Sequence, residues 1–185
     1  MPIPHEEPPG IAVMESTMRI LGIDPGLRIT GYGCVQIDDV SNVTIVEAGI
    51  IRVPTSAPLE RRLHHLHTEL DQVIAELTPG HMAVESLFTH PERMSTGLRM
   101  GHARGVILLA AAARDLEVME LPPAEVKKAV TGNGRADKRR MQLAITAQYN
   151  LSEIPEPPDV ADALAVALCA ARRLDTELRQ RQEAV

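Results

Sequence analysis

The fold is decided by the stretch MRILGIDPG, which covers residues 18–26. Its apolar residues predict a strand from Met18 to Asp24, and Pro25-Gly26 then turns the chain. Asp24 is therefore expected at the rim of a sheet, where its carboxylate has access to solvent. The residues alone leave a second interpretation open, in which this carboxylate only stabilises the turn by bonding its own backbone.

Two further strands are predicted directly after this turn. The runs Thr30–Ile37 and Val43–Val53 are rich in β-branched residues, and mostly polar residues separate them at positions 38–42. Because only short turns join the three runs, they indicate an antiparallel meander. We expect this meander to form the first part of the sheet.

Helices and strands alternate in the rest of the chain. The leucines of residues 59–77 recur at helical spacing, and Pro79-Gly80 stops this pattern. Such alternation after a meander is typical of an α/β fold with a mixed sheet and flanking helices, which carries its functional sites at strand ends. Strands are expected at 81–85 and 116–121, and helices at 59–77, 93–114, from Pro122-Pro123 to Gly132, at 137–149 and at 160–174.

Three more acids stand where the chain leaves or enters an apolar element. Glu85 ends the predicted strand 81–85, as Asp24 ends the first strand. Asp159 and Asp162 are three residues apart at the start of the last predicted helix, which places them on one face. A salt bridge by Glu85 and helix capping by Asp159 stay open as structural roles. Asp162 is flanked by alanine and leucine residues, so its charge needs a partner or a metal.

A cluster of four carboxylates predicts a divalent metal site. Hard oxygen ligands without a nearby cysteine select Mg²⁺, with Mn²⁺ as the alternative. Two such ions about 4 Å apart can activate a water, hold a scissile phosphate and stabilise the leaving oxygen during phosphodiester hydrolysis. Without metal the carboxylates repel one another, and some of them take up protons near neutral pH.

One segment of the chain is basic enough to bind phosphates. The net charge of −6 counts against nucleic-acid binding when it is taken as an average. Three Glu among residues 1–17, which contain no Lys or Arg, account for half of that charge. Residues 127–140 carry a local charge of +5, which favours phosphate binding. The basic residues of this segment are Lys127, Lys128, Arg135, Lys138, Arg139 and Arg140.

The length of 185 residues fits one domain, which we expect at residues 18–174. Residues 1–17 contain four Pro and three Glu and lack the basic and apolar regions of a signal peptide. They are predicted to be a disordered extension, or to lie upstream of a true start at Met18. Residues 175–185 are predicted to be a flexible tail.

Neither a membrane segment nor a disulfide framework is predicted. No apolar run approaches the ~20 residues that a membrane-spanning helix requires. Cys34 and Cys169 lie far apart and show no zinc-binding spacing. This cysteine usage favours a cytoplasmic location.

Several blocks of the sequence resemble the RuvC family of Holliday-junction resolvases. The opening block is ILGIDPGLRITGYG at residues 20–33. A lone DPG motif is weak support, whereas the ordered set of blocks from Met18 to Arg173 is highly specific. The further blocks are AVESLF at 83–88, GHARGV at 101–106, VK at 126–127 with GNGRADK at 132–138, and DVADALA at 159–165.

The resemblance implies a fold, an activity and partners. The fold is RNase H-like, and the activity is a metal-dependent endodeoxyribonuclease that acts in recombination and DNA repair. The enzyme is implied to be a homodimer with one active site per subunit, which nicks two opposed strands of a four-way DNA junction. It is also implied to work with the branch-migration proteins RuvA and RuvB.

The resemblance also assigns roles to single residues. Asp24, Glu85, Asp159 and Asp162 match the metal ligands of the family. Lys127 and Lys138 match positions that contact DNA near the cut, and their neighbours Arg135 and Arg139 are added as candidate DNA contacts. Phe88, the only Phe of the chain, matches an aromatic residue that stacks against unpaired bases. Without the family match, a core position for Phe88 and a solvated face for the lysines are the more usual roles.

Three other functions are compatible with parts of this pattern. A related RNase H-like nuclease that processes RNA has a similar Asp-Gly motif after its first strand, but the fourth acid in the DxxD helix favours RuvC. An actin-like phosphotransferase normally needs two such domains, and this chain has room for one. A catalytically inactive junction-binding protein is disfavoured because all four acids are intact.

Overall fold

A computed structural model describes residues 17–38, 40–87 and 94–183 of the chain. Its sheet has the strand order β3-β2-β1-β4-β5. β1 pairs antiparallel with β2, and β2 antiparallel with β3, while β4 lies parallel to both β1 and β5. The expected meander and mixed sheet are therefore confirmed. The strands are β1 (Met18–Asp24), β2 (Ile29–Ile37), β3 (Val43–Arg52), β4 (His81–Glu85) and β5 (Glu117–Leu121).

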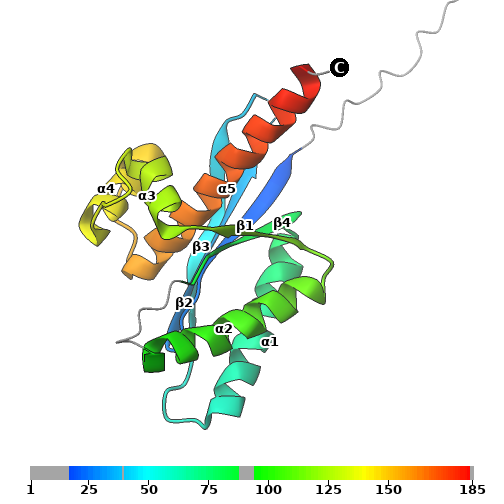
Figure 1. Cartoon of the computed structure of the whole chain (residues 1–185), viewed down its shortest axis with the longest axis vertical. Helices are drawn as coiled ribbons and strands as arrows, with labels where there is room; N and C mark the ends of the chain where they lie inside the picture. Colours follow the sequence, from blue (N-terminus) through cyan, green and yellow to red (C-terminus); the bar gives the residue numbers. More distant parts are fainter. Residues whose placement is uncertain (1–16, 39, 88–93, 184–185) are drawn as a thin grey trace, which may run out of the picture.

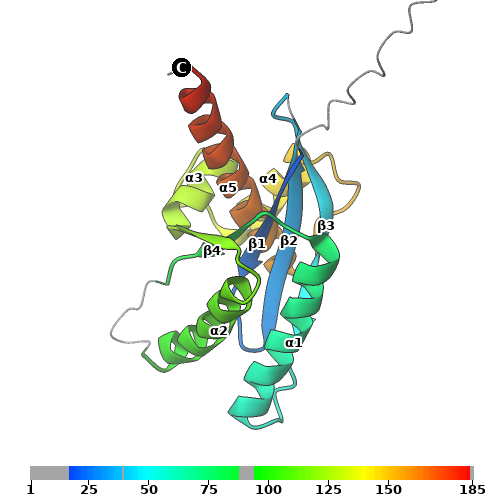
Figure 2. The same ribbon diagram turned by 90° about the vertical axis from the view of Figure 1, so that its right-hand side faces the viewer.

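Helices cover both faces of this sheet (Figures 1 and 2). One face carries α3, α4 and α5, and the other carries α1 and α2. Within the described ranges, no helix is both long and apolar enough to cross a membrane. The helices are α1 (Leu59–Leu77), α2 (Met94–Ala112), α3 (Pro123–Thr131), α4 (Lys138–Gln148) and α5 (Pro158–Glu183).

Alternating side chains of β1 supply both hydrophobic cores. Ile20 belongs to the core beneath α5, whereas Leu21 and Ile23 belong to the core beneath α1 and α2. Successive residues of a strand point to opposite faces, so an apolar run without polar gaps marks a strand that is covered on both sides. The central position of β1 follows from this run, and Asp24 lies at the end of the central strand.

Helix α5 lies directly on β1 and β2 because glycines leave room for its backbone. A Cβ at Gly22 would lie 2.4 Å from the carbonyl oxygen of Ala163, and a Cβ at Gly31 would lie 2.1 Å from that of Asp159. Both distances are far below a van der Waals contact. The glycines therefore set how closely the start of α5 approaches the end of β1.

Gly31→Ala is expected to lower the free energy of unfolding by about 1–3 kcal/mol, the usual cost of overpacking. The added methyl group would push against the backbone of Asp159, which no rotamer change relieves. Chemical denaturation measures the effect. Gly80→Ala is the matched control, because its Cβ would meet nothing closer than the Arg19 carbonyl oxygen at 3.8 Å. Equal stabilities of the two variants would contradict the close packing of α5.

Helix α5 is longer than the sequence predicts. Its expected end at Leu174 is wrong, and residues 175–183 are helical rather than a flexible tail. Exposed charges extend the helix through pairs one turn apart, since Arg179 Nε lies 3.1 Å from Asp175 Oδ2. The Asp175 carboxylate also accepts a hydrogen bond from Ser41, next to the turn between β2 and β3. Because polar contacts hold this part of the helix, its sequence shows no apolar periodicity from which the extension could be predicted.

Candidate active site

The ends of β1 and β4 bring two acids together. The two strands are parallel neighbours, and Ile23 of β1 is paired with Val84 of β4. The next residues are Asp24 and Glu85, so both carboxylates leave the same edge of the sheet. The turn after Asp24 is held by another residue, because the Thr30 hydroxyl donates to the Gly26 carbonyl oxygen at 2.6 Å.

The start of α5 adds a third acid. Asp162 lies one turn inside this helix and joins Asp24 and Glu85 in the lining of one pocket of about 210 Å³. We call it the acidic pocket. Its other lining residues are Val126, Lys127, Lys138 and Met141, which come from α3 and α4.

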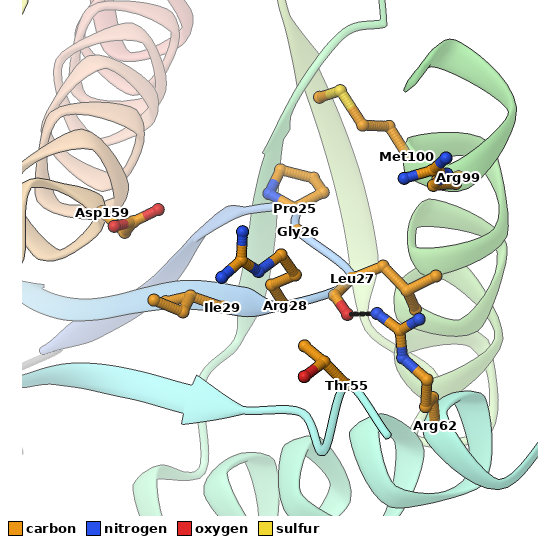
Figure 3. Close-up of a pocket in the computed structure, with 10 residues that line it drawn as sticks. All are labelled: Pro25, Gly26, Leu27, Arg28, Ile29, Thr55, Arg62, Arg99, Met100 and Asp159. Atoms are coloured by element: carbon orange, nitrogen blue, oxygen red, sulfur yellow. Dashed lines mark hydrogen bonds between the residues drawn. The ribbon is translucent and has the colours of Figure 1, made fainter. Parts of the chain in front are cut away.

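Asp159 points to a neighbouring pocket instead. It lies within the first turn of α5, which begins at Pro158, so it is not the residue that caps the helix. Its carboxylate lines the space on the other side of the β1–β2 turn, near Arg28 and Ile29 (Figure 3). Three of the four predicted acids therefore share the acidic pocket, and the fourth stands at its border.

The electrostatics of the pocket centre on Asp24. Burial raises the pKa of this carboxyl from 3.8 to about 7, and the surrounding negative charges add to the rise. An ionised carboxylate is poorly solvated there and is repelled by its neighbours. The contributing acids are Asp162, Glu85 and Asp159, while Lys138 acts in the opposite direction.

The other two carboxylates of the pocket are perturbed in the same direction. Burial raises the pKa of both Glu85 and Asp162, and lysines on α3 and α4 oppose the rise. Lys138 Nζ lies 3.5 Å from Asp162 Oδ2. The Lys138 side chain is 75% exposed, so this ion pair contributes little to stability and is free to exchange partners.

The donor set of the acidic pocket fits a hard divalent cation. Its ligating atoms are carboxylate oxygens, and their mutual repulsion is relieved when a cation lies between them. In the described part of the chain, no three His, Cys, Asp or Glu side chains already have the spacing that holds a metal ion. A cation held by these carboxylates would therefore need them to lie closer together than they do here.

The candidate DNA contacts are placed differently from one another. Lys127 and Lys138 line the acidic pocket. Arg135, in the loop before α4, and Arg139, in its first turn, are exposed and do not line it. Phe88 lies outside the described residues.

Arg104 is a positioning residue that sequence reasoning missed. It is only 8% exposed on α2, and its Nη1 donates to the Glu85 carbonyl oxygen at 2.8 Å. Its Nη2 lies 2.6 Å from Oε2 of Glu120 on β5. The guanidinium thus ties α2 to the backbone at the end of β4 and to a side chain of β5. A basic residue inside a helix rich in alanine was the signal that could have identified it.

For the phosphodiester hydrolysis that the sequence predicts, Arg104→Met is expected to lower kcat about 10-fold while KM stays within about 3-fold, and to cost about 1–3 kcal/mol of stability. The change leaves the Glu85 carbonyl without its donor, so the carboxylate loses its fixed position. Steady-state kinetics and denaturation measure the two effects, and Arg104→Lys should recover part of kcat.

The matched control for Arg104 is Arg114→Met. Arg114 also binds a carboxylate, with its Nε 2.7 Å from Asp71 Oδ1, but this pair lies at the surface and away from the pocket. It should have little effect on stability and leave kcat unchanged, because exposed ion pairs contribute little to stability. A KM effect without a kcat effect in Arg104→Met would contradict the positioning role.

Comparisons with known proteins identify the family of the chain. The sequence model of a family described as Crossover junction endodeoxyribonuclease RuvC matches residues 20–170. A protein of that description from Rhodopirellula baltica is 48% identical over 154 residues, which cover 83% of this chain and 86% of the relative. One from Heliobacterium modesticaldum is 46% identical over 157 residues, with coverages of 85% and 96%. Among solved structures, T. thermophilus RuvC in complex with Holliday junction substrate has a TM-score of 0.75 at 30% identity, covering 82% of this chain and 92% of that one.

Proposed function

Because this chain belongs to the RuvC family of crossover junction endodeoxyribonucleases, we propose that the acidic pocket is its active site. The chain has the RNase H-like α/β fold and is a Holliday-junction resolvase, a metal-dependent endonuclease of recombination and DNA repair. We assign the role of metal ligands to Asp24, Glu85, Asp162 and, from the border of the pocket, Asp159.

One observation carries this assignment. Carboxylates from β1, β4 and α5 meet in a single pocket, although these elements are far apart in the sequence. Each acid alone has an ordinary structural role available, but such roles give no reason for their convergence. The raised pKa of Asp24 supports the assignment, because strongly perturbed acids in a cleft are typical of functional sites.

We propose two Mg²⁺ ions per active site, with Mn²⁺ as a substitute, because carboxylate oxygens are the ligands that these ions prefer. When bound, such ions supply a nucleophilic water and stabilise the charge of the leaving oxygen. The role of the carboxylates is to hold these ions in place and orient them. Burial of Asp24 excludes bulk water from the same place, which strengthens each charge interaction there.

The lysines of the pocket would guide the DNA strand. Lys127 and Lys138 stand on the side of α3 and α4, and Lys138 changes partner from Asp162 to a phosphate oxygen of the substrate. This exchange brings positive charge to the phosphate as it frees a carboxylate. Arg135 and Arg139, both exposed, would contact the backbone further along. Base stacking by Phe88 is retained as a proposal from the family resemblance alone.

The wider assembly follows the family. We propose that the chain acts as a homodimer that makes paired symmetric nicks in a four-way junction, in the cytoplasm, together with RuvA and RuvB. We assign the catalytic domain to residues 18–183, because α5 continues to Glu183, and residues 1–17 to an extension outside it.

Cleavage of a synthetic four-way DNA junction, compared with duplex RNA of matched length, tests the proposal. The purified chain with Mg²⁺ should nick two opposed junction strands at symmetric positions and leave the RNA intact. Preferred cleavage of RNA would indicate an RNA-processing nuclease instead. Tight ATP binding by calorimetry without any nicking would indicate a phosphotransferase.

A further inference from the structure

A second pocket lies on the other side of the turn that follows Asp24. It has a volume of about 680 Å³ and is lined by the β1–β2 loop and by residues of α1, α2 and α5 (Figure 3). Three arginines stand in its wall against one acid, Asp159. We call it the arginine pocket. Its arginines are Arg28 from the loop, Arg62 from α1 and Arg99 from α2.

The loop that carries Arg28 is held rigidly. Thr30 binds the Gly26 carbonyl oxygen, and the Val53 amide donates to the Arg28 carbonyl oxygen at 2.9 Å. Arg62 donates from its Nη2 to the carbonyl oxygen of Leu27, a bond drawn in Figure 3. Arg62 is therefore both part of the wall and the anchor of the loop. A charged group held in this way loses little conformational entropy when a ligand binds.

The chemistry of the wall selects a phosphodiester. Guanidinium groups bind phosphate oxygens through paired N–H donors, and three of them far outweigh the single carboxylate of Asp159. Leu27, Ile29 and Met100 give the same pocket an apolar part, which suits the sugar beside a backbone phosphate. Arg28 and Arg99 are exposed, so a long strand reaches them without a change of fold.

The position of the pocket connects it with the reaction. Pro25 and Gly26 in its wall directly follow Asp24, and Asp159 stands one turn before Asp162. The arginine pocket and the acidic pocket therefore flank the same strand end. We propose that the arginine pocket binds a phosphate of the junction strand next to the scissile one, through Arg28, Arg62 and Arg99. This inference rests on the proposed function of the acidic pocket.

The double variant Arg28→Gln/Arg99→Gln tests this assignment, and Arg62 is left intact to keep the loop anchored. Affinity for a synthetic four-way junction is measured in Ca²⁺ across a salt series. The variant should bind about 10- to 100-fold more weakly, and the slope of log affinity against log salt should fall by about 0.9, as expected when one phosphate is no longer neutralised. Cleavage of saturating junction in Mg²⁺ should change much less than affinity.

Two further variants complete the experiment. Arg181→Gln is the control, because it removes one arginine charge at the far end of α5. This variant should bind the junction within about 2-fold of the parent. Arg28→Lys/Arg99→Lys keeps the charge and should recover part of the affinity, which also reports on the site if the Gln pair folds poorly. Parental affinity and salt slope in the Gln pair would overturn the proposal.

Calorimetry with inorganic phosphate separates a small-anion site from a DNA subsite. The parent could bind inorganic phosphate and the Gln pair not, while both bind the junction equally well. This result would contradict the DNA assignment. If the parent does not nick the junction at all, the proposed function fails as a whole. A parent that nicks normally, beside a Gln pair that binds normally, overturns only the role of the arginine pocket.

Discussion

Asp24→Asn is expected to abolish junction cleavage, by about 1,000-fold or more, while junction affinity stays within about 3-fold of the parent. Asn has the size and shape of Asp but lacks the charge that attracts a divalent cation. Asp24 also has the central position among the acids, since three other carboxylates influence its pKa. Its loss therefore removes the ligand on which the others converge.

Binding should survive this change because other groups provide it. Lys127 and Lys138 line the pocket independently of the Asp24 charge, and affinity for DNA depends mostly on contacts between basic residues and phosphates. Single-turnover cleavage with saturating enzyme measures the chemical step, and gel shift in Ca²⁺ measures affinity.

The matched control is Asp115→Asn. Asp115 is exposed after α2 and has a φ of 53°, a conformation that Asn adopts readily. This variant should cleave at the parental rate. Parental cleavage by Asp24→Asn as well would remove the basis for the metal assignment, and a joint loss of binding and cleavage would indicate a structural role.

The central part of the site could be predicted from local sequence alone. Asp24 and Glu85 each end an apolar run, and strands with such runs are buried on both faces of a sheet. Their carboxylates can then reach solvent only at the edge of the sheet. Helix α1 connects β3 with β4, and β3 runs in the same direction as β1 because the meander reverses the chain twice. A crossover through this helix leaves β4 parallel to β1, so the meeting of the two acids follows from the topology.

The helix acids were harder to place. A spacing of three residues predicts that Asp159 and Asp162 share a face, yet they line different pockets. The boundary between these pockets is the β1–β2 turn, whose position depends on how closely α5 approaches Gly31. Helical periodicity contains no information about that distance.

Contacts between distant elements could not be predicted from the sequence. Arg104 reaches Glu85 and Glu120 from a helix whose pattern indicates only a buried face. The arginine pocket takes one arginine from each of three parts of the chain, and none of these arginines stands in the basic segment at residues 127–140. The local charge of the sequence thus identified the lysines of the acidic pocket but not the arginines of the arginine pocket.

The metal-free protein is expected to become less stable as pH rises from about 4 to about 7. Asp24 has a pKa of about 7 in the folded chain against 3.8 when exposed, so the folded state keeps a proton that the unfolded state releases. The stability due to the protonated carboxyl is full below pH 4 and is lost as pH rises through 7. The pKa values of Glu85 and Asp162 are also raised, which acts in the same direction.

Asp24→Asn should remove most of this pH dependence and stabilise the metal-free chain by about 2 kcal/mol at pH 8. A shift from 3.8 to about 7 corresponds to about 4 kcal/mol, and solvent near the partly buried carboxylate screens part of it. Urea denaturation in EDTA at pH 4 and pH 8 measures the difference, which should vanish at pH 4. A variant no more stable than the parent at pH 8 would contradict the raised pKa of Asp24, which burial and the neighbouring carboxylates cause.

Divalent metal should reverse the order of stability. At a Mn²⁺ concentration about 100 times the dissociation constant, the parent gains about 2.7 kcal/mol, while a chain without the Asp24 carboxylate gains little. The parent then becomes the more stable protein at pH 8. Such a crossover separates metal binding from a purely structural cluster, because a structural carboxylate would be stabilising in EDTA as well. Proteins keep destabilising charges where function needs them, and the acidic pocket is expected to show this trade-off directly.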